Sequence, residues 1–100
     1  MVRIFIHGYR IKNMTRKEYI IDCLMEDDEA FTQIFEYFLV ENIDISDIEV
    51  KKLLDELLEE GYITVNYTWK NENDEYPYSL TKKGIEAWEN IKEVDNIADS

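Results

Sequence analysis

Few side chains in this sequence have the chemistry for catalysis or metal binding. The chain has one histidine, His7, and one cysteine, Cys23. Thiol catalysis needs a cysteine beside an activating base, and no motif accompanies this pair. A structural zinc site needs four ligands, which one cysteine and one histidine do not supply. We therefore interpret His7 as an exposed side chain and Cys23 as a buried structural one.

Acidic clusters and glycines are the remaining candidates for a ligand site. The runs 26–29 (EDDE) and 71–75 (NENDE) carry carboxylates, but neither has the ligand spacing of a calcium loop, so we predict solvated turns. The three glycines, Gly8, Gly61 and Gly84, are too scattered for a phosphate-binding loop. The sequence predicts no catalytic residue, metal or cofactor, and hence a protein that is not an enzyme.

Charge is the most informative feature of the composition. The chain has 23 acidic and 11 basic residues, a net charge of -12 and a pI near 4.3. Residues 1–20 hold five of the basic groups and one acid, so the rest of the chain is more acidic still. Such a surface repels phosphate backbones and anionic membranes and attracts basic partners.

The location of the protein is predicted from what the sequence lacks. No run approaches the roughly 20 apolar residues that cross a bilayer. The start of the sequence has too short an apolar stretch for a signal peptide and no small-residue cleavage site. A single cysteine excludes an intramolecular disulfide and fits a reducing compartment. We expect a cytoplasmic protein with no membrane partner.

Three helices are predicted between Met14 and Gly61. The first begins at a capping box, residues 15–18 (TRKE), and the third at a second box, residues 46–49 (SDIE). The second has apolar residues at helical spacing over 30–39, and the acidic run before it is expected to form the turn and its N-cap. Gly61 is expected to end the third helix.

From Tyr62 the apolar period changes to two, which predicts a strand over 62–69. Residues 70–75 contain no apolar side chain and are expected to form a hairpin tip. The second strand covers 76–80, with Pro77 indicating an edge position. Thr81 then caps a last helix that carries Ile85, Trp88, Ile91 and Val94 toward the core. The side chains expected to be mostly buried are Ile20, Leu24, Phe31, Ile34, Phe38, Val50, Leu54, Leu57, Ile63 and Trp88.

One domain is predicted over 14–95, followed by a frayed tail over 96–100. Residues 1–13 stand apart, because their alternating apolar residues surround His7 and Gly8. Four interpretations of them stay open: a short hairpin, a single strand added to the sheet, a disordered arm, or residues that are not part of the natural protein, which would then start at Met14.

The order of these elements resembles the winged helix-turn-helix. Residues 53–63 (LLDELLEEGYI) and 78–86 (YSLTKKGIE) resemble bacterial regulators of the MarR and PadR type. In those families a leucine-rich helix ending in Glu-Gly-Tyr-Ile leads into the wing, and Leu-Thr-x-x-Gly leaves it. The resemblance covers about residues 15–94. It implies an α+β winged helix with three bundled helices, a two-stranded antiparallel wing and a C-terminal helix.

The sequence departs from that pattern where such regulators touch DNA. In a DNA-binding member the third helix enters the major groove with basic and polar side chains. Here two lysines and six acids occupy its exposed positions: Asp47, Glu49, Lys51, Lys52, Asp55, Glu56, Glu59 and Glu60. The wing tip has Glu72, Asp74 and Glu75 against Lys70 alone. Non-specific DNA affinity needs basic groups that displace counterions from the phosphates, and this face has few of them. No DNA-reading residue of those families can therefore be assigned to a position in this sequence.

Two functional hypotheses follow. The first is an acidic binding protein for a basic protein partner, such as an immunity protein that inhibits a nuclease toxin. Its candidate contact residues are Asp55, Glu56, Glu59, Glu60, Tyr62, Tyr76 and Tyr78. Tyrosines are favoured interface anchors, although the three rings are equally interpreted as covering the edge of the core. The second is a transcriptional regulator that binds DNA as a homodimer, with Lys51, Lys52 and Lys70 as its candidate contacts.

Overall fold

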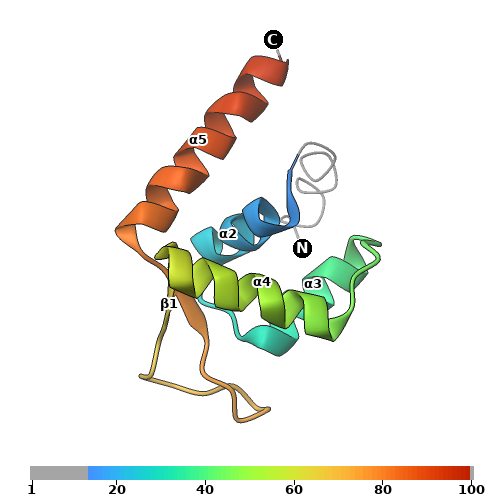
Figure 1. Ribbon diagram of the computed structural model, residues 1–100, viewed down its shortest axis with the longest axis vertical. Helices are drawn as coiled ribbons and strands as arrows, with labels where there is room; N and C mark the ends of the chain where they lie inside the picture. The colour runs from blue at the N-terminus through green and yellow to red at the C-terminus, as the bar shows by residue number, and fades with distance from the viewer. Residues whose placement is uncertain (1–13, 100) are drawn as a thin grey trace.

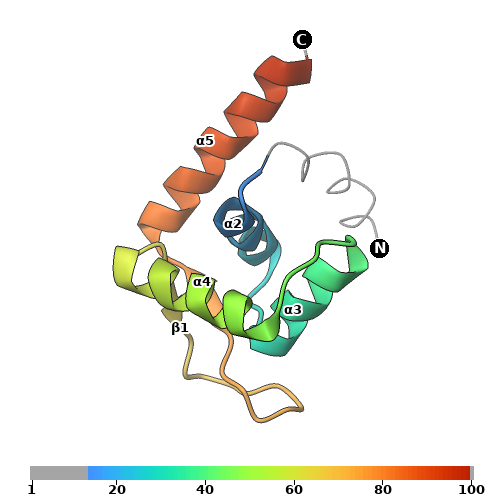
Figure 2. The same ribbon diagram turned by 45° about the vertical axis from the view of Figure 1, so that its right-hand side comes forward.

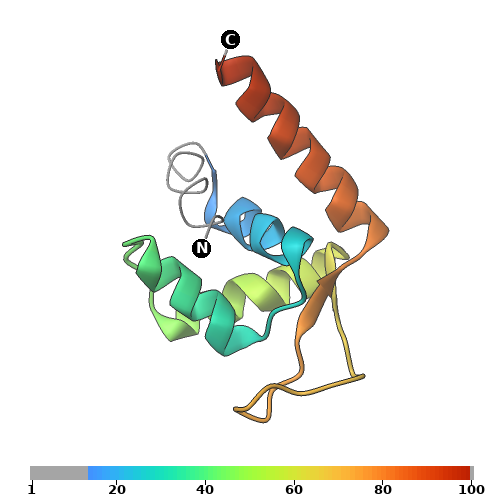
Figure 3. The same ribbon diagram turned by 180° about the vertical axis from the view of Figure 1, so that it is seen from behind.

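The computed structural model describes residues 14–99, with side chains described to residue 91. The elements run α2 (Arg16–Glu26), α3 (Phe31–Val40), α4 (Asp47–Glu60), β1 (Ile63–Val65), β2 (Tyr78–Leu80) and α5 (Lys82–Asp99). Helices α2, α3 and α4 pack together, while the β1–β2 loop and the end of α5 extend away from them in opposite directions (Figures 1 and 3). The predicted α+β winged-helix order is confirmed.

Of the two predicted capping boxes, the one at α2 is complete and the one at α4 is formed in part. Glu18 N–H donates to the Thr15 hydroxyl at 3.1 Å and Thr15 N–H donates to Glu18 Oε1 at 2.9 Å, so the first capping box is complete. At α4, Glu49 N–H donates to Ser46 Oγ at 3.1 Å. The Glu49 side chain, however, binds the Arg16 guanidinium at 2.5 Å and ties the starts of α2 and α4 together.

The start of α3 differs from the prediction that the acidic run supplies its N-cap. The N-cap is Ala30, which has no side-chain oxygen; instead its N–H donates to Gln33 Oε1 at 3.1 Å. Glu29 forms an antiparallel bridge with Tyr78, with N–O distances of 2.8 and 3.3 Å. Asp28 accepts hydrogen bonds from Asn66 Nδ2 and Ser79 Oγ. The run is therefore held against the wing rather than capping a helix.

The wing strands are shorter than the predicted 62–69 and 76–80. They pair antiparallel from Ile63–Leu80 to Val65–Tyr78, and one further bond runs from Asn66 N–H to the Pro77 carbonyl at 2.8 Å. The Asn66 side chain then accepts from the Thr68 amide at 2.9 Å. This local turn competes with continued pairing, so the alternation of apolar residues after Asn66 does not lead to a longer strand.

The core lies between α2, α3, α4 and the start of the sheet. Eight of the ten side chains predicted to be buried are so. Phe31 and Trp88 are half-buried at its edge, where Trp88 Nε1 donates to the buried Asp22 at 2.8 Å. In α5, Ile91 is buried but Ile85 is exposed, which corrects its predicted inward position. Val94 lies outside the described side chains.

The predicted domain limits are only partly covered by the structure. The backbone of α5 continues to Asp99, past the expected domain end at residue 95. The four interpretations of residues 1–13 lie outside the described residues, and the limits 14–95 stay a prediction. No helix in the described part of the chain is long and apolar enough to cross a bilayer.

Candidate macromolecule-binding surface

The outward side of α4 is the surface on which both functional hypotheses depend. Helix α4 begins after its N-cap Ser46 and ends at Gly61. Gly61 has φ +85°, in the left-handed region, and Tyr62 N–H donates back to the Leu57 carbonyl at 3.0 Å. Val50, Leu54 and Leu57 are buried. The helical period therefore leaves the charged residues facing solvent, with Asp47, Asp55 and Glu59 exposed.

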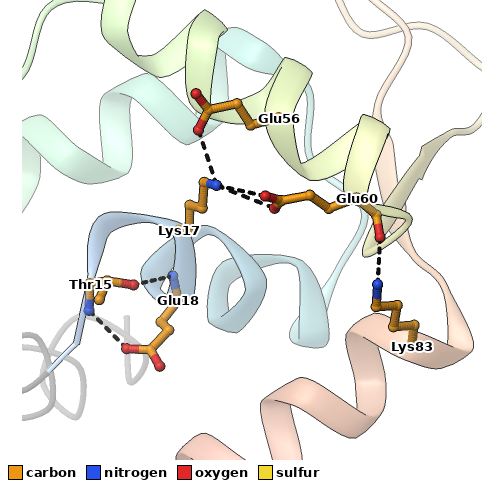
Figure 4. Close-up of polar contacts among 6 residues, drawn as sticks. All are labelled: Thr15, Lys17, Glu18, Glu56, Glu60 and Lys83. Carbon is orange, nitrogen blue, oxygen red and sulfur yellow. Dashed lines mark hydrogen bonds and ion pairs between the residues drawn. The ribbon is translucent and has the colours of Figure 1, made fainter.

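Two of the four predicted acidic contact residues are engaged within the protein. Lys17 of α2 lies 3.0 Å from Glu56 and 3.1 Å from Glu60 (Figure 4). Its pKa is raised by hydrogen bonds to Glu56 and then to Glu60, so it keeps its proton to a higher pH than an isolated lysine does. The Glu60 carbonyl also accepts from Lys83 Nζ at 2.7 Å. Glu56 and Glu60 therefore help to join α2, α4 and α5. This leaves Glu59 and Asp55 as the more available acids, although Asp55 lies 3.5 Å from Lys51 of the same helix.

The lysines proposed for DNA contact have acidic neighbours. Lys51 lies 3.5 Å from Asp55, one helical turn away. The pKa of Lys51 is raised by electrostatic interaction, first with the nearby Tyr78 and then with Asp55. Lys70 lies 3.0 Å from Asp74 and over the Tyr76 ring at 4.8 Å. Lys52 is exposed on α4. On both α4 and the wing tip, a lysine that could contact a DNA phosphate therefore lies beside a carboxylate.

A groove of about 660 Å³ lies between the first turns of α4 and the wing. We call it the aromatic groove, and its apolar lining consists of Phe31, Ile48, Val65, Tyr67, Tyr76 and Tyr78. Asp47 and Glu75 add carboxylates, and Lys51 adds an ammonium group. Figure 2 shows the β1–β2 loop below α4.

The groove is held in shape by contacts between the wing and α3. Glu75 Oε1 accepts from the Thr32 amide at 3.3 Å and from Asn71 Nδ2 at 3.0 Å. Asn71 Nδ2 also donates to Gln33 at 3.1 Å. The rings of Tyr67 and Tyr76 meet edge-on, with centroids 4.9 Å apart. The wing loop is thus tied to the start of α3.

The three tyrosines predicted as contacts lie in different surroundings in the structure. Tyr76 is 39% exposed in the groove, but Tyr78 is 7% exposed and forms part of the core. Tyr62 lies away from the groove, with Lys83 4.5 Å from its ring centroid. On α4 and the wing, the large exposed apolar residues missing from the predicted contacts are Ile48 at 78%, Tyr67 at 71% and Trp69 at 45%. Ile48 was detectable, because it falls outside the apolar stripe of its helix.

Metal binding has no candidate site in the part of the chain that the structure describes. No group of three or more His, Cys, Asp or Glu side chains there is arranged to hold a metal ion. Cys23 is buried, as predicted. His7 lies outside the described residues.

Comparison with known proteins gives structural neighbours only. No protein-family model matches the chain, and no curated protein matches it. Bacillus subtilis PadR in complex with operator DNA superposes with a TM-score of 0.62 and 24% identity, over 74% of this chain and 43% of that one. A Lactococcus lactis ZitR mutant superposes with a TM-score of 0.58 and 26% identity, over 75% of this chain and 47% of that one. The adhesin competence repressor AdcR of Streptococcus pyogenes superposes with a TM-score of 0.64 and 15% identity, over 97% of this chain and 69% of that one.

These neighbours confirm the resemblance to MarR- and PadR-type regulators at the level of the fold. This chain spans less than half the length of the PadR and ZitR chains that it matches. Of these three structures, PadR was solved in complex with operator DNA and AdcR is named as a repressor. The chain is a winged helix-turn-helix domain similar to those of PadR, ZitR and AdcR.

Proposed function

We propose that this domain works without catalysis, by binding a basic protein through the surface formed by α4 and the wing. The carrying observation is the charge of that surface. Six acids and two lysines occupy the polar positions of α4. Arg16 and Lys17 of α2 pair with Glu49, Glu56 and Glu60, which leaves Asp47, Asp55 and Glu59, and Lys51 and Lys70 each lie beside a carboxylate. Duplex DNA brought to this face meets like charge, whereas a cationic protein surface meets opposite charge.

A nuclease is the class of partner that this chemistry fits. A surface that binds nucleic-acid phosphates is cationic, so an acidic domain can occupy it and exclude the substrate. Inhibition of this kind is the action of an immunity protein. The solved structures offer no support for a protein partner; the support is electrostatic.

The second candidate is a transcriptional regulator that binds DNA as a homodimer. The observation in its favour is the fold, since PadR, one of the neighbours, was solved on its operator. Under this hypothesis Lys51, Lys52 and Lys70 are the contacts on α4 and the wing. Shared fold alone is a weak guide to function, because winged helices also serve as protein-binding modules.

Cross-linked capture with the full chain as bait separates the two candidates. Protein and DNA cross-links are collected in parallel from cells of its source, and the captured protein is then purified and its association rate measured. We expect a basic protein whose association slows steeply as salt rises. Recovery of a specific DNA site and no basic protein would favour the regulator.

The control bait carries Asp55→Lys and Glu59→Lys. These two residues are preferable to Glu56 and Glu60, because the latter also hold Lys17 and their loss would perturb packing. We expect the reversal to lower the association rate for the partner by about tenfold or more at low salt, with a smaller change in dissociation. An unchanged association rate would exclude this face as the binding surface.

A further inference from the structure

Two hollows adjoin on the surface of α4. The aromatic groove lies at its first turns, and a second hollow of about 380 Å³ runs along the helix past Lys52, Asp55, Glu56 and Glu59. Ile48 and Lys51 line both of them. The two hollows therefore meet at Ile48 and Lys51; the first has a largely apolar lining, and the second is lined by three acids and two lysines.

The apolar end has the character of an anchor site. Ile48 and Tyr67 are 78% and 71% exposed, although each is a large hydrophobic side chain. Tyrosines fixed around a groove are favoured anchors in protein interfaces, because they bury much area at a low entropy cost. Glu75, fixed by the Thr32 amide and Asn71, keeps the groove shaped before anything binds.

The acidic end determines the charge of the occupant. Asp55 and Glu59 are exposed along the second hollow, and Asp47 adds a third exposed carboxylate beside the groove. Lys51 and Lys52 oppose them, but Lys51 is already 3.5 Å from Asp55. From Ile48 to Glu59 the helix rises about 16 Å at roughly 1.5 Å per residue, the length of about five residues of extended chain.

We infer that this surface is a docking track for a short basic segment of the protein partner. An aromatic or long aliphatic side chain of that segment enters the aromatic groove, and the lysines or arginines next to it lie along Asp55 and Glu59. The inference rests on the proposed function and adds to it an anchor residue and the spacing of the charges.

Synthetic peptides titrated against the full chain test the track. The first probe is a blocked hexapeptide of tryptophan, glycine and four arginines; the second replaces tryptophan with serine, and the third replaces the arginines with glutamines. Burial of the anchor is expected to make the first probe bind about tenfold more tightly than the second. The third is expected to bind more weakly than the first, and this difference is expected to shrink as salt rises.

Variants then locate each contribution. Ile48→Ser with Tyr67→Ala is expected to abolish the advantage of the tryptophan probe while leaving the serine probe unchanged. Asp55→Lys with Glu59→Lys is expected to weaken both arginine probes. Leu39→Ser is the matched control, because Leu39 is also apolar and 51% exposed but lies on α3. All altered positions are exposed, so the fold is expected to survive, and Tyr67→Ala alone is the milder variant.

Different outcomes overturn different claims. Equal binding of the tryptophan and serine probes, or an advantage that survives Ile48→Ser with Tyr67→Ala, would overturn the anchor groove and leave a basic partner in place. Failure of every probe together with micromolar binding of duplex DNA would overturn the proposed function as well. A dimer of the chain that Ile48→Ser dissociates would assign the groove to a second copy, and this too would overturn the inference.

Discussion

A β-carbon on Gly84 would lie 2.2 Å from the carbonyl oxygen of Tyr62. The first turn of α5 therefore packs on the backbone that enters the wing, at a distance only glycine permits. The same Tyr62 carbonyl accepts from Thr81 N–H at 3.1 Å, and the Thr81 hydroxyl donates to the Gly61 carbonyl at 2.6 Å. These contacts set the position of the wing relative to α4.

Gly84→Ala is expected to destabilise the fold by roughly 1–3 kcal/mol, the cost of overpacking a close contact. Helix propensity acts the other way, since alanine is better than glycine by about 1 kcal/mol within a helix. A net loss in urea unfolding therefore reports the clash. Lys82→Ala, at the exposed neighbouring turn, is the control and is expected to change stability by less than about 0.5 kcal/mol. A more stable Gly84→Ala protein would show that the close approach is not maintained in solution.

Leu57→Ala tests the packing of α4 from its inner side. Leu57 is 1% exposed, and its truncation is expected to cost about 2–5 kcal/mol of unfolding free energy. Leu39→Ala is the control, because Leu39 is 51% exposed and has less burial to lose. A cost for Leu57→Ala below about 1 kcal/mol, or one equal to that of the control, would place the wrong face of α4 toward the core.

Lys17 predicts a pH dependence at the alkaline end. Its pKa in the folded protein is raised above 10.5 by Glu56 and Glu60, so the folded state binds its proton more tightly than the unfolded chain does. The stabilisation is complete below pH 10.5 and is lost as pH rises through the folded pKa. The stability difference between the natural protein and Lys17→Met, followed by urea unfolding, is expected to shrink above that pH. A difference that stays constant up to about pH 12 would contradict the linkage.

The helix ends could be predicted from the sequence because their determinants are local. Thr15 and Glu18 form their capping box within one turn, and Gly61 adopts its left-handed conformation where the helix stops. The glycine at the close approach, Gly84, belongs to the Leu-Thr-x-x-Gly phrase that carries the family resemblance. Burial of α2 and α4 side chains followed from helical spacing, which is also local in origin.

Contacts between distant segments had no comparable signal. The Glu29–Tyr78 bridge pairs backbone groups, which leave no residue pattern. The ion pairs of Lys17 with Glu56 and Glu60 depend on how α2 crosses α4. The predicted contact residues consequently included the buried Tyr78 and omitted two exposed side chains: Ile48, which the spacing of its helix could have indicated, and Tyr67, whose exposure depends on where the wing folds.

Titration of duplex DNA against the full chain tests most directly the claim that the α4 face repels nucleic acid. A labelled random-sequence duplex is titrated at several salt concentrations with the natural protein and with Lys51→Ala/Lys52→Ala. We predict binding at physiological salt weaker than the roughly 10⁻⁴–10⁻⁶ M typical of non-specific DNA binders, with no effect of the lysine substitutions. Micromolar or tighter binding that falls when Lys51 and Lys52 are removed would contradict the account and identify a DNA-binding regulator.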